Sequence, residues 1–158
     1  MLNKNNPHTE DRVSSRGLHR FADDFFQAYN LITSQKNNAV QVRYYLLCHS
    51  FELSMKALLR EAGYSVKQLQ DFGHDLEKIA TELETNEKTK IHWTPEDKEM
   101  IRIANTHYVT KEMEYFTRGA KVLVDPDKFS NFLGFWLRVS HITIVEIARK
   151  EGRPFPSI

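Results

Sequence analysis

The sequence has few of the residues that interrupt helices. Its 158 residues include six glycines and five prolines. The regular alternation of β-branched and polar residues that marks a half-buried strand is also scarce. An all-α fold is therefore predicted. The length is typical of one domain and is sufficient to bury a core without metals or disulfides.

The scarcity of cysteine, of long apolar runs and of net charge argues against disulfide-linked, membrane-spanning and strongly nucleic-acid-attracting proteins. The single cysteine, Cys48, cannot form a disulfide within the chain, which fits a reducing compartment. No apolar run approaches the ~18 residues of a membrane span, and the polar first residues lack the apolar core of a secretory signal. With 22 Lys and Arg against 21 Asp and Glu, no overall field attracts nucleic acid or membranes. The sequence predicts a soluble cytoplasmic protein without membrane contact.

Apolar spacing divides the chain into a bundle of about five helices. A polar arm at 1–13 precedes one helical domain at 14–152, and a short tail follows at 153–158. The predicted helices cover about 15–33, 38–62, 74–86, 95–108 and 126–151. Residues 65–70 are predicted to form a short helical turn, and 109–128 a loop with a short extended piece. Phe135 and Ile142 fall outside the apolar stripe of the last helix, so a partner subunit could cover them.

The second predicted helix is apolar on most sides but carries three ionisable residues. His49, Glu52 and Lys56 are three and four positions apart, which places them on one stripe. The turn before the next helix adds His74 and Asp75. Buried ionisable groups are costly unless each has a partner. One interpretation is a structural network in which Glu52 pairs with Lys56 and Asp75 lies at a helix start. The other is a small pocket in which His49, Lys56 and His74 hold a phosphate or nucleotide.

Two stretches of the chain resemble the HEPN family of small helical domains. The first joins Glu52 and residues 56–59 (KALL) to residues 73–76 (GHDL). The second joins residues 104–108 (ANTHY) to residues 114–119 (EYFTRG). The resemblance implies an antiparallel bundle of four or five helices that usually forms a homodimer. It also implies a role among RNA-cleaving toxins and defence effectors, or among nucleotide-binding and non-catalytic relatives.

The family's ribonucleases use an arginine followed, after four to six residues, by a histidine, without a metal. In such a pair the arginine would hold the scissile phosphate and the histidine would move a proton. Arg102 and His107 match this spacing on a late helix and are the candidate catalytic pair. Because they lie about 140° apart on a helix, they reach one phosphate only if the helix ends or bends near His107. The same spacing recurs at Arg12 and His19 and at Arg43 and His49.

Basic residues cluster near both ends of the domain, in a pattern that allows two interpretations. Each cluster could bind phosphate, or could simply complement a helix dipole and solvate a surface. The first cluster consists of Arg12, Arg16, His19 and Arg20, and the second of Arg149, Lys150 and Arg153.

Two functions are predicted from these observations. The first is a HEPN-like RNA-directed effector, in particular a metal-independent endoribonuclease of toxin or defence type. The second is a non-catalytic helical module that binds a nucleotide or a partner protein. The predicted partners are a second copy of the chain, RNA or a nucleotide, and a cognate antitoxin or other protein. No metal or cofactor is predicted, because the repeated glutamate-then-histidine pairs of di-iron bundles are missing.

Overall fold

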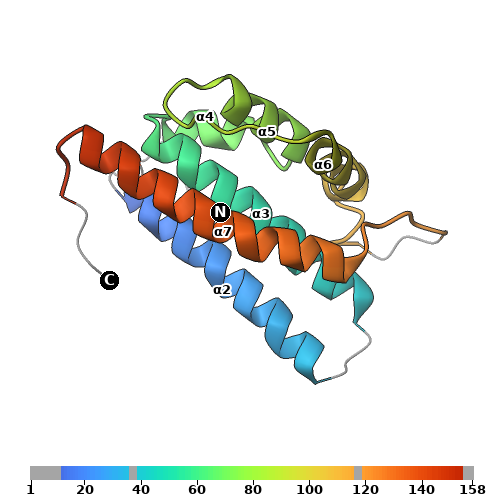
Figure 1. Ribbon diagram of the computed structural model, residues 1–158. Coiled ribbons are helices and arrows are strands. Elements are labelled where there is room, and N and C mark those ends of the chain that lie inside the picture. Colours follow the sequence, from blue (N-terminus) through green and yellow to red (C-terminus); the bar gives the residue numbers. More distant parts are fainter. Residues whose placement is uncertain (1–11, 36–38, 116–118, 155–158) are drawn as a thin grey trace.

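A computed structural model describes residues 12–35, 39–115 and 119–154, and these residues form six helices and no strand (Figure 1). The helices are α2 (Ser15–Ser34), α3 (Val40–Glu61), α4 (Val66–Asp71), α5 (Leu76–Thr85), α6 (Pro95–Tyr108) and α7 (Pro126–Lys150). The all-α prediction is confirmed for this part of the chain. Most of the predicted arm at 1–13 and tail at 153–158 lies outside the described residues.

The five predicted helices correspond to α2, α3, α5, α6 and α7, and the predicted turn at 65–70 is a sixth helix, α4. A capping box starts α4, in which Ser65 and Gln68 exchange side-chain and backbone hydrogen bonds. The predicted loop after α6 is confirmed for the described residues up to position 125, which form turns and irregular chain without a strand, and residues 126–128 begin α7.

Helix α3 is the centre of the molecule, because it contacts each of the other five helices. The long helices α2, α3 and α7 lie side by side, with α2 running opposite to the other two (Figure 1). Helices α4, α5 and α6 lie together over another side of α3. A helix enclosed in this way must be apolar on most sides, which explains the composition of residues 40–61.

The core between α3 and α7 is aromatic. Phe51 is fully buried, and its ring meets those of Trp93, Phe129 and Trp136 edge to face at centroid distances of 6.0–6.2 Å. Such arrangements add stabilisation beyond that of the buried area. The indole of Trp136 donates a hydrogen bond of 2.8 Å to the Ser54 hydroxyl, so this buried polar pair is satisfied.

The outer surface of α7 keeps large apolar side chains in contact with solvent. Phe135 and Ile142 are 60% and 57% exposed, as their positions outside the apolar stripe predicted. On α2, Phe21 and Leu31 are exposed to a similar extent.

Among the described residues, no helix combines the length and the apolar character that crossing a membrane requires.

Candidate functional site

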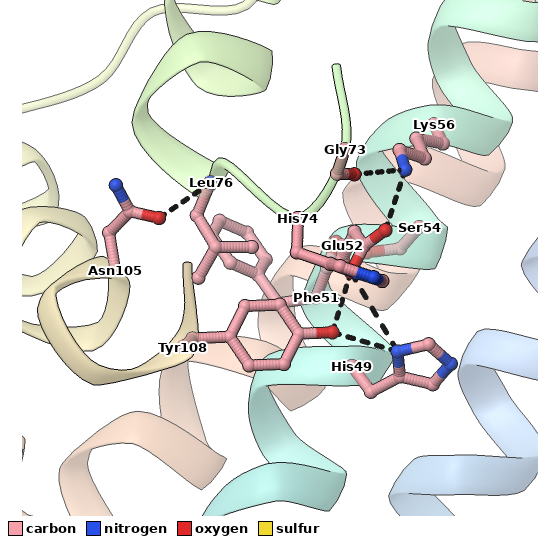
Figure 2. Close-up of polar contacts among 10 residues, drawn as sticks. All are labelled: His49, Phe51, Glu52, Ser54, Lys56, Gly73, His74, Leu76, Asn105 and Tyr108. Atoms are coloured by element: carbon pink, nitrogen blue, oxygen red, sulfur yellow. Dashed lines mark hydrogen bonds and ion pairs between the residues drawn. The ribbon is translucent and has the colours of Figure 1, made fainter. Parts of the chain in front are cut away.

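A carboxylate buried in the middle of α3 organises a polar network. Glu52 is 2% exposed. Its Oε1 accepts a 2.6 Å hydrogen bond from Lys56 Nζ, and its Oε2 accepts one of 2.9 Å from His74 Nδ1 and one of 2.5 Å from the Tyr108 hydroxyl (Figure 2). The expected burial and pairing of Glu52 are confirmed. The network thus joins α3, the turn before α5 and the last residue of α6.

His49 joins the network through Tyr108. Its Nδ1 lies 2.8 Å from the Tyr108 oxygen and 3.7 Å from Oε2 of Glu52. The phenol has one proton, which it donates to Glu52, so its oxygen must accept from His49. The proton of His49 is therefore on Nδ1. Tyr45 and Phe25 contact the faces and edge of this imidazole, at centroid distances of 5.4 Å and 4.5 Å.

The turn at Gly73 brings His74 back toward α3. Gly73 has φ = 59°, in the left-handed region that favours glycine. This conformation directs its carbonyl toward Lys56, whose Nζ donates a 2.6 Å hydrogen bond to it (Figure 2). Lys56 is thus held by one carboxylate and one carbonyl, which compensates for a side-chain exposure of only 12%.

The charges of the network are fixed by these contacts. Burial alone would raise the pKa of Glu52, but the contacts from His49 and His74 and the charge of Lys56 outweigh it, so the pKa lies below its ordinary value. The hydrogen bond to Glu52 raises the pKa of His74. Burial and the neighbouring Glu52 charge raise the pKa of Tyr108. Glu52 is consequently ionised and Tyr108 protonated near neutral pH, each in the state its hydrogen bonds require.

Asp75 has a different role from that of Glu52. It is the N-cap of α5 and accepts a 3.0 Å hydrogen bond from the backbone N–H of Lys78, which confirms its predicted place at a helix start. Asn105 of α6 lies beside it, donating to Asp75 and Glu77 at 3.0 Å each. The Asn105 side-chain oxygen accepts from the backbone N–H of Leu76 at 2.8 Å (Figure 2).

Asn105 and Tyr108 were not among the network residues predicted from the sequence. Both appeared only within residues 104–108 of the motif that resembles HEPN domains. A signal was nevertheless present, because Asn105 is a polar residue next to the apolar stripe of Ile101, Ala104 and Tyr108. A buried asparagine needs several partners, and the three that it finds are on α5.

The candidate catalytic pair is not brought together within the chain. Helix α6 is continuous from Pro95 to Tyr108, so Arg102 and His107 project about 140° apart. Arg102 forms a bidentate ion pair with Glu99, in which its Nε donates to Oε2 at 2.8 Å and its Nη2 donates to Oε1 at 2.7 Å. His107 is 13% exposed and its Nδ1 lies 2.8 Å from Oε2 of Glu112. Each residue has its own carboxylate partner on a different side of the helix.

The two other arginine–histidine pairs with this spacing are not brought together either, because the two members of each pair lie in different surroundings. The Nε2 of His19 lies 3.0 Å from the carbonyl of Leu137 on α7, while Arg12 is exposed just before α2. The guanidinium of Arg43 lies 5.5 Å from the centre of the Tyr29 ring, whereas His49 belongs to the Glu52 network.

A groove of about 960 Å³ runs between α2 and α7. Residues from the basic cluster at the start of α2 and from the middle of α7 line it, together with apolar side chains from both helices. Its lining includes Arg16, His19, Arg20, Asp23, Phe26, Gly134, Leu137, Arg138, His141 and Ile142. The second basic cluster does not contribute to this lining; its Arg153 pairs with Glu61 of α3 at 2.5 Å.

Within the described ranges, no group of three or more His, Cys, Asp or Glu side chains is arranged to hold a metal ion. Comparisons with protein-family models, with curated protein sequences and with solved structures found no match to this chain. The resemblance to HEPN domains therefore rests on the motifs quoted above.

Proposed function

We propose that this protein is a HEPN-like, non-catalytic binding module that engages its ligand at the groove between α2 and α7. The observation that carries the proposal is the contrast between this groove and α6. The groove is a concavity of ligand size with arginines from two helices at its rim. On α6, each member of the candidate catalytic pair is already held by its own carboxylate.

A ribonuclease site places different demands on Arg102 and His107. Both side chains must reach the same phosphate, and the histidine must be free to exchange a proton with the substrate. Here Arg102 is exposed beside Glu99, and His107 is largely enclosed beside Glu112. The geometry of one chain supports binding better than cleavage.

The Glu52 network serves structure in this proposal. Its donors are directed at Glu52, at the Tyr108 oxygen or at the Gly73 carbonyl. A phosphate entering beside Lys56 and His74 would compete with a buried carboxylate that these residues already stabilise. The network is therefore better suited to joining three segments of the chain than to binding an anion.

The predicted homodimer stays a prediction. Exposed apolar side chains on α2 and α7, such as Leu31 and Phe135, are the surface that a second copy or another protein partner would cover. A cognate antitoxin likewise stays a predicted partner.

RNA cleavage in EDTA tests the non-catalytic assignment. Purified protein and the His107→Ala variant are incubated with total RNA, and the same two chains are expressed in a bacterial host to score growth. We expect no cleavage that depends on His107 and identical growth for the two chains. Cleavage by the unaltered protein that the His107→Ala variant lacks would contradict the proposal and favour the endoribonuclease.

A further inference from the structure

We propose that the α2–α7 groove binds a small organic phosphate, with the phosphate at its arginine-lined rim and an apolar body on its floor. This inference rests on the proposed function and specifies the ligand class of the same groove. It depends on the meeting of basic residues from α2 and α7 in one groove, which the sequence alone did not predict. Three basic residues of the lining come from the start of α2, and two from the middle of α7, more than 100 residues later in the chain.

The rim is strongly cationic. Arg16 and Arg20 lie one helical turn apart on α2, and Arg138 faces them from α7, against a single acid, Asp23. Arg20 and Arg138 are exposed, and no carboxylate in the described part of the chain pairs with either of them. Guanidinium groups that line one groove from two helices suit the several oxygens of a phosphate, because each group can hold a phosphate with two hydrogen bonds.

The two histidines of the lining keep α2 and α7 in register. The rings of His19 and His141 lie with their centroids 5.5 Å apart. The Nε2 of His19 lies 3.0 Å from the Leu137 carbonyl and 3.1 Å from the Ser140 hydroxyl. Burial lowers the pKa of His19, so near neutral pH it is an uncharged structural link. The arginines, rather than His19, then supply the positive charge.

The floor suits an apolar body. Phe26, Leu137 and Ile144 all line the groove, and Leu137 and Ile144 are buried. The Phe26 ring packs against Gly134 of α7, since a Cβ atom at that position would lie 3.4 Å from Cζ of Phe26.

A short ligand fits the charge pattern better than a long polyanion. The positive stretch on α2 ends with Asp23 and Asp24, three and four residues after Arg20 and so on the next turn. Both are exposed. A nucleic-acid strand that continued along α2 would bring its next phosphates toward these carboxylates, and the net charge of +1 offers no wider attraction.

Titration of the full chain with four probes tests the assignment. The probes are phenyl phosphate, adenosine monophosphate, inorganic phosphate and an eight-nucleotide RNA, followed by the amide NMR signals of the protein. We expect saturable binding of the two phosphate esters, tighter than that of inorganic phosphate. The amides of Gly17 and Gly134, which line the groove, should shift, whereas those of Gly63 and Gly73 should not.

Two arginine variants and one matched control define the binding residues. Arg20→Gln and Arg138→Gln should each weaken ester binding about tenfold or more, the usual effect of losing a hydrogen bond to a charged group. Lys67→Gln removes an exposed cation of α4, outside the groove lining, and should leave the affinity unchanged. Since all three side chains are exposed, the variants should unfold at the same temperature as the unaltered protein.

Three results would overturn the inference. They are the absence of saturable ester binding, binding that both groove variants retain in full, and groove shifts produced by the RNA but not by the esters. None of these depends on cleavage, so they are distinct from the His107-dependent RNA hydrolysis that would contradict the proposed function.

Discussion

Glu52 links three parts of the chain that are distant in sequence. Lys56 precedes the end of α3, His74 precedes α5, and Tyr108 ends α6, yet all three donate to this one carboxylate. An ionised group at 2% exposure persists only because these donors replace the water that it has lost. The stability of the fold should therefore respond strongly to the loss of this single side chain.

Replacing Glu52 with leucine should lower the free energy of unfolding by about 3–5 kcal/mol, because Lys56 and His74 lose their shared counter-charge in a largely enclosed position. Urea denaturation followed by circular dichroism measures the change. Glu99→Leu, at an exposed acid of α6, is the control and should leave the unfolding midpoint nearly unchanged. Equal midpoints for the unaltered protein and Glu52→Leu would show that the network contributes little.

The sequence predicted one part of this network and not the rest, for a physical reason. His49, Glu52 and Lys56 are related by the period of a single helix, so their proximity follows from helix geometry. Tyr108 meets them only because α6 packs against α3 at a particular height and angle. No local pattern specifies that packing. The groove has the same origin, since the facing of Arg20 and Arg138 depends on how α2 and α7 are placed against each other.

At the scale of elements, Asn105 fastens α6 to the first turn of α5. Its side chain accepts from the Leu76 N–H, one of the donors that a helix start leaves unpaired, and donates to Asp75 and Glu77. Helices α5 and α6 both pack on α3. Asn105 therefore determines the relative position of two helices that the core alone would hold less specifically.

Substitution of Asn105 should weaken the contact between α5 and α6, by an amount that depends on the replacing residue. Asn105→Ala leaves the buried Leu76 N–H without its acceptor and should cost about 1–3 kcal/mol of unfolding free energy. Asn105→Asp should cost more, since a third carboxylate would face Asp75 and Glu77. Thermal unfolding ranks the two variants, and hydrogen exchange at Leu76 should accelerate in both. A more stable aspartate variant would contradict this account.

At the scale of the whole molecule, His74 makes stability depend on pH. Its hydrogen bond to Glu52 raises its pKa above the ordinary 6.5, against the opposing charges of Lys56 and Lys111. The folded protein thus binds the proton more tightly than the unfolded chain does. The contribution of His74 is complete below pH 6.5 and is lost as the pH rises through the higher pKa of the folded state.

The free energy of unfolding should therefore fall as the pH rises above about 6.5, and His74→Gln should remove that slope. Denaturant titrations at half-unit pH steps from 6 to 9, compared between the two chains, isolate the contribution of this residue. Titration of the His74 ring proton by NMR provides the pKa directly. A slope that is unchanged in His74→Gln would assign the pH dependence to another group.

The fold class was accessible from the sequence because it depends on counts and periods along the chain. Scarce glycine and proline, together with apolar spacing, located all five long helices. The short α4 was assigned as a turn because six residues provide less than two full turns of periodicity. The segment after α6 was recognised as a loop from its glycine and proline, although apolar residues such as Val122 resemble a strand locally; the described residues contain no strand with which they could pair.

Helix α3 contacts each of the other five described helices, and this position has an evolutionary consequence. A substitution in its inner residues must be accommodated by several neighbours at once, whereas the outer sides of α2 and α7 can change one residue at a time. Among related chains, α3 should therefore diverge slowly, and new binding specificities should arise on the α2–α7 surface.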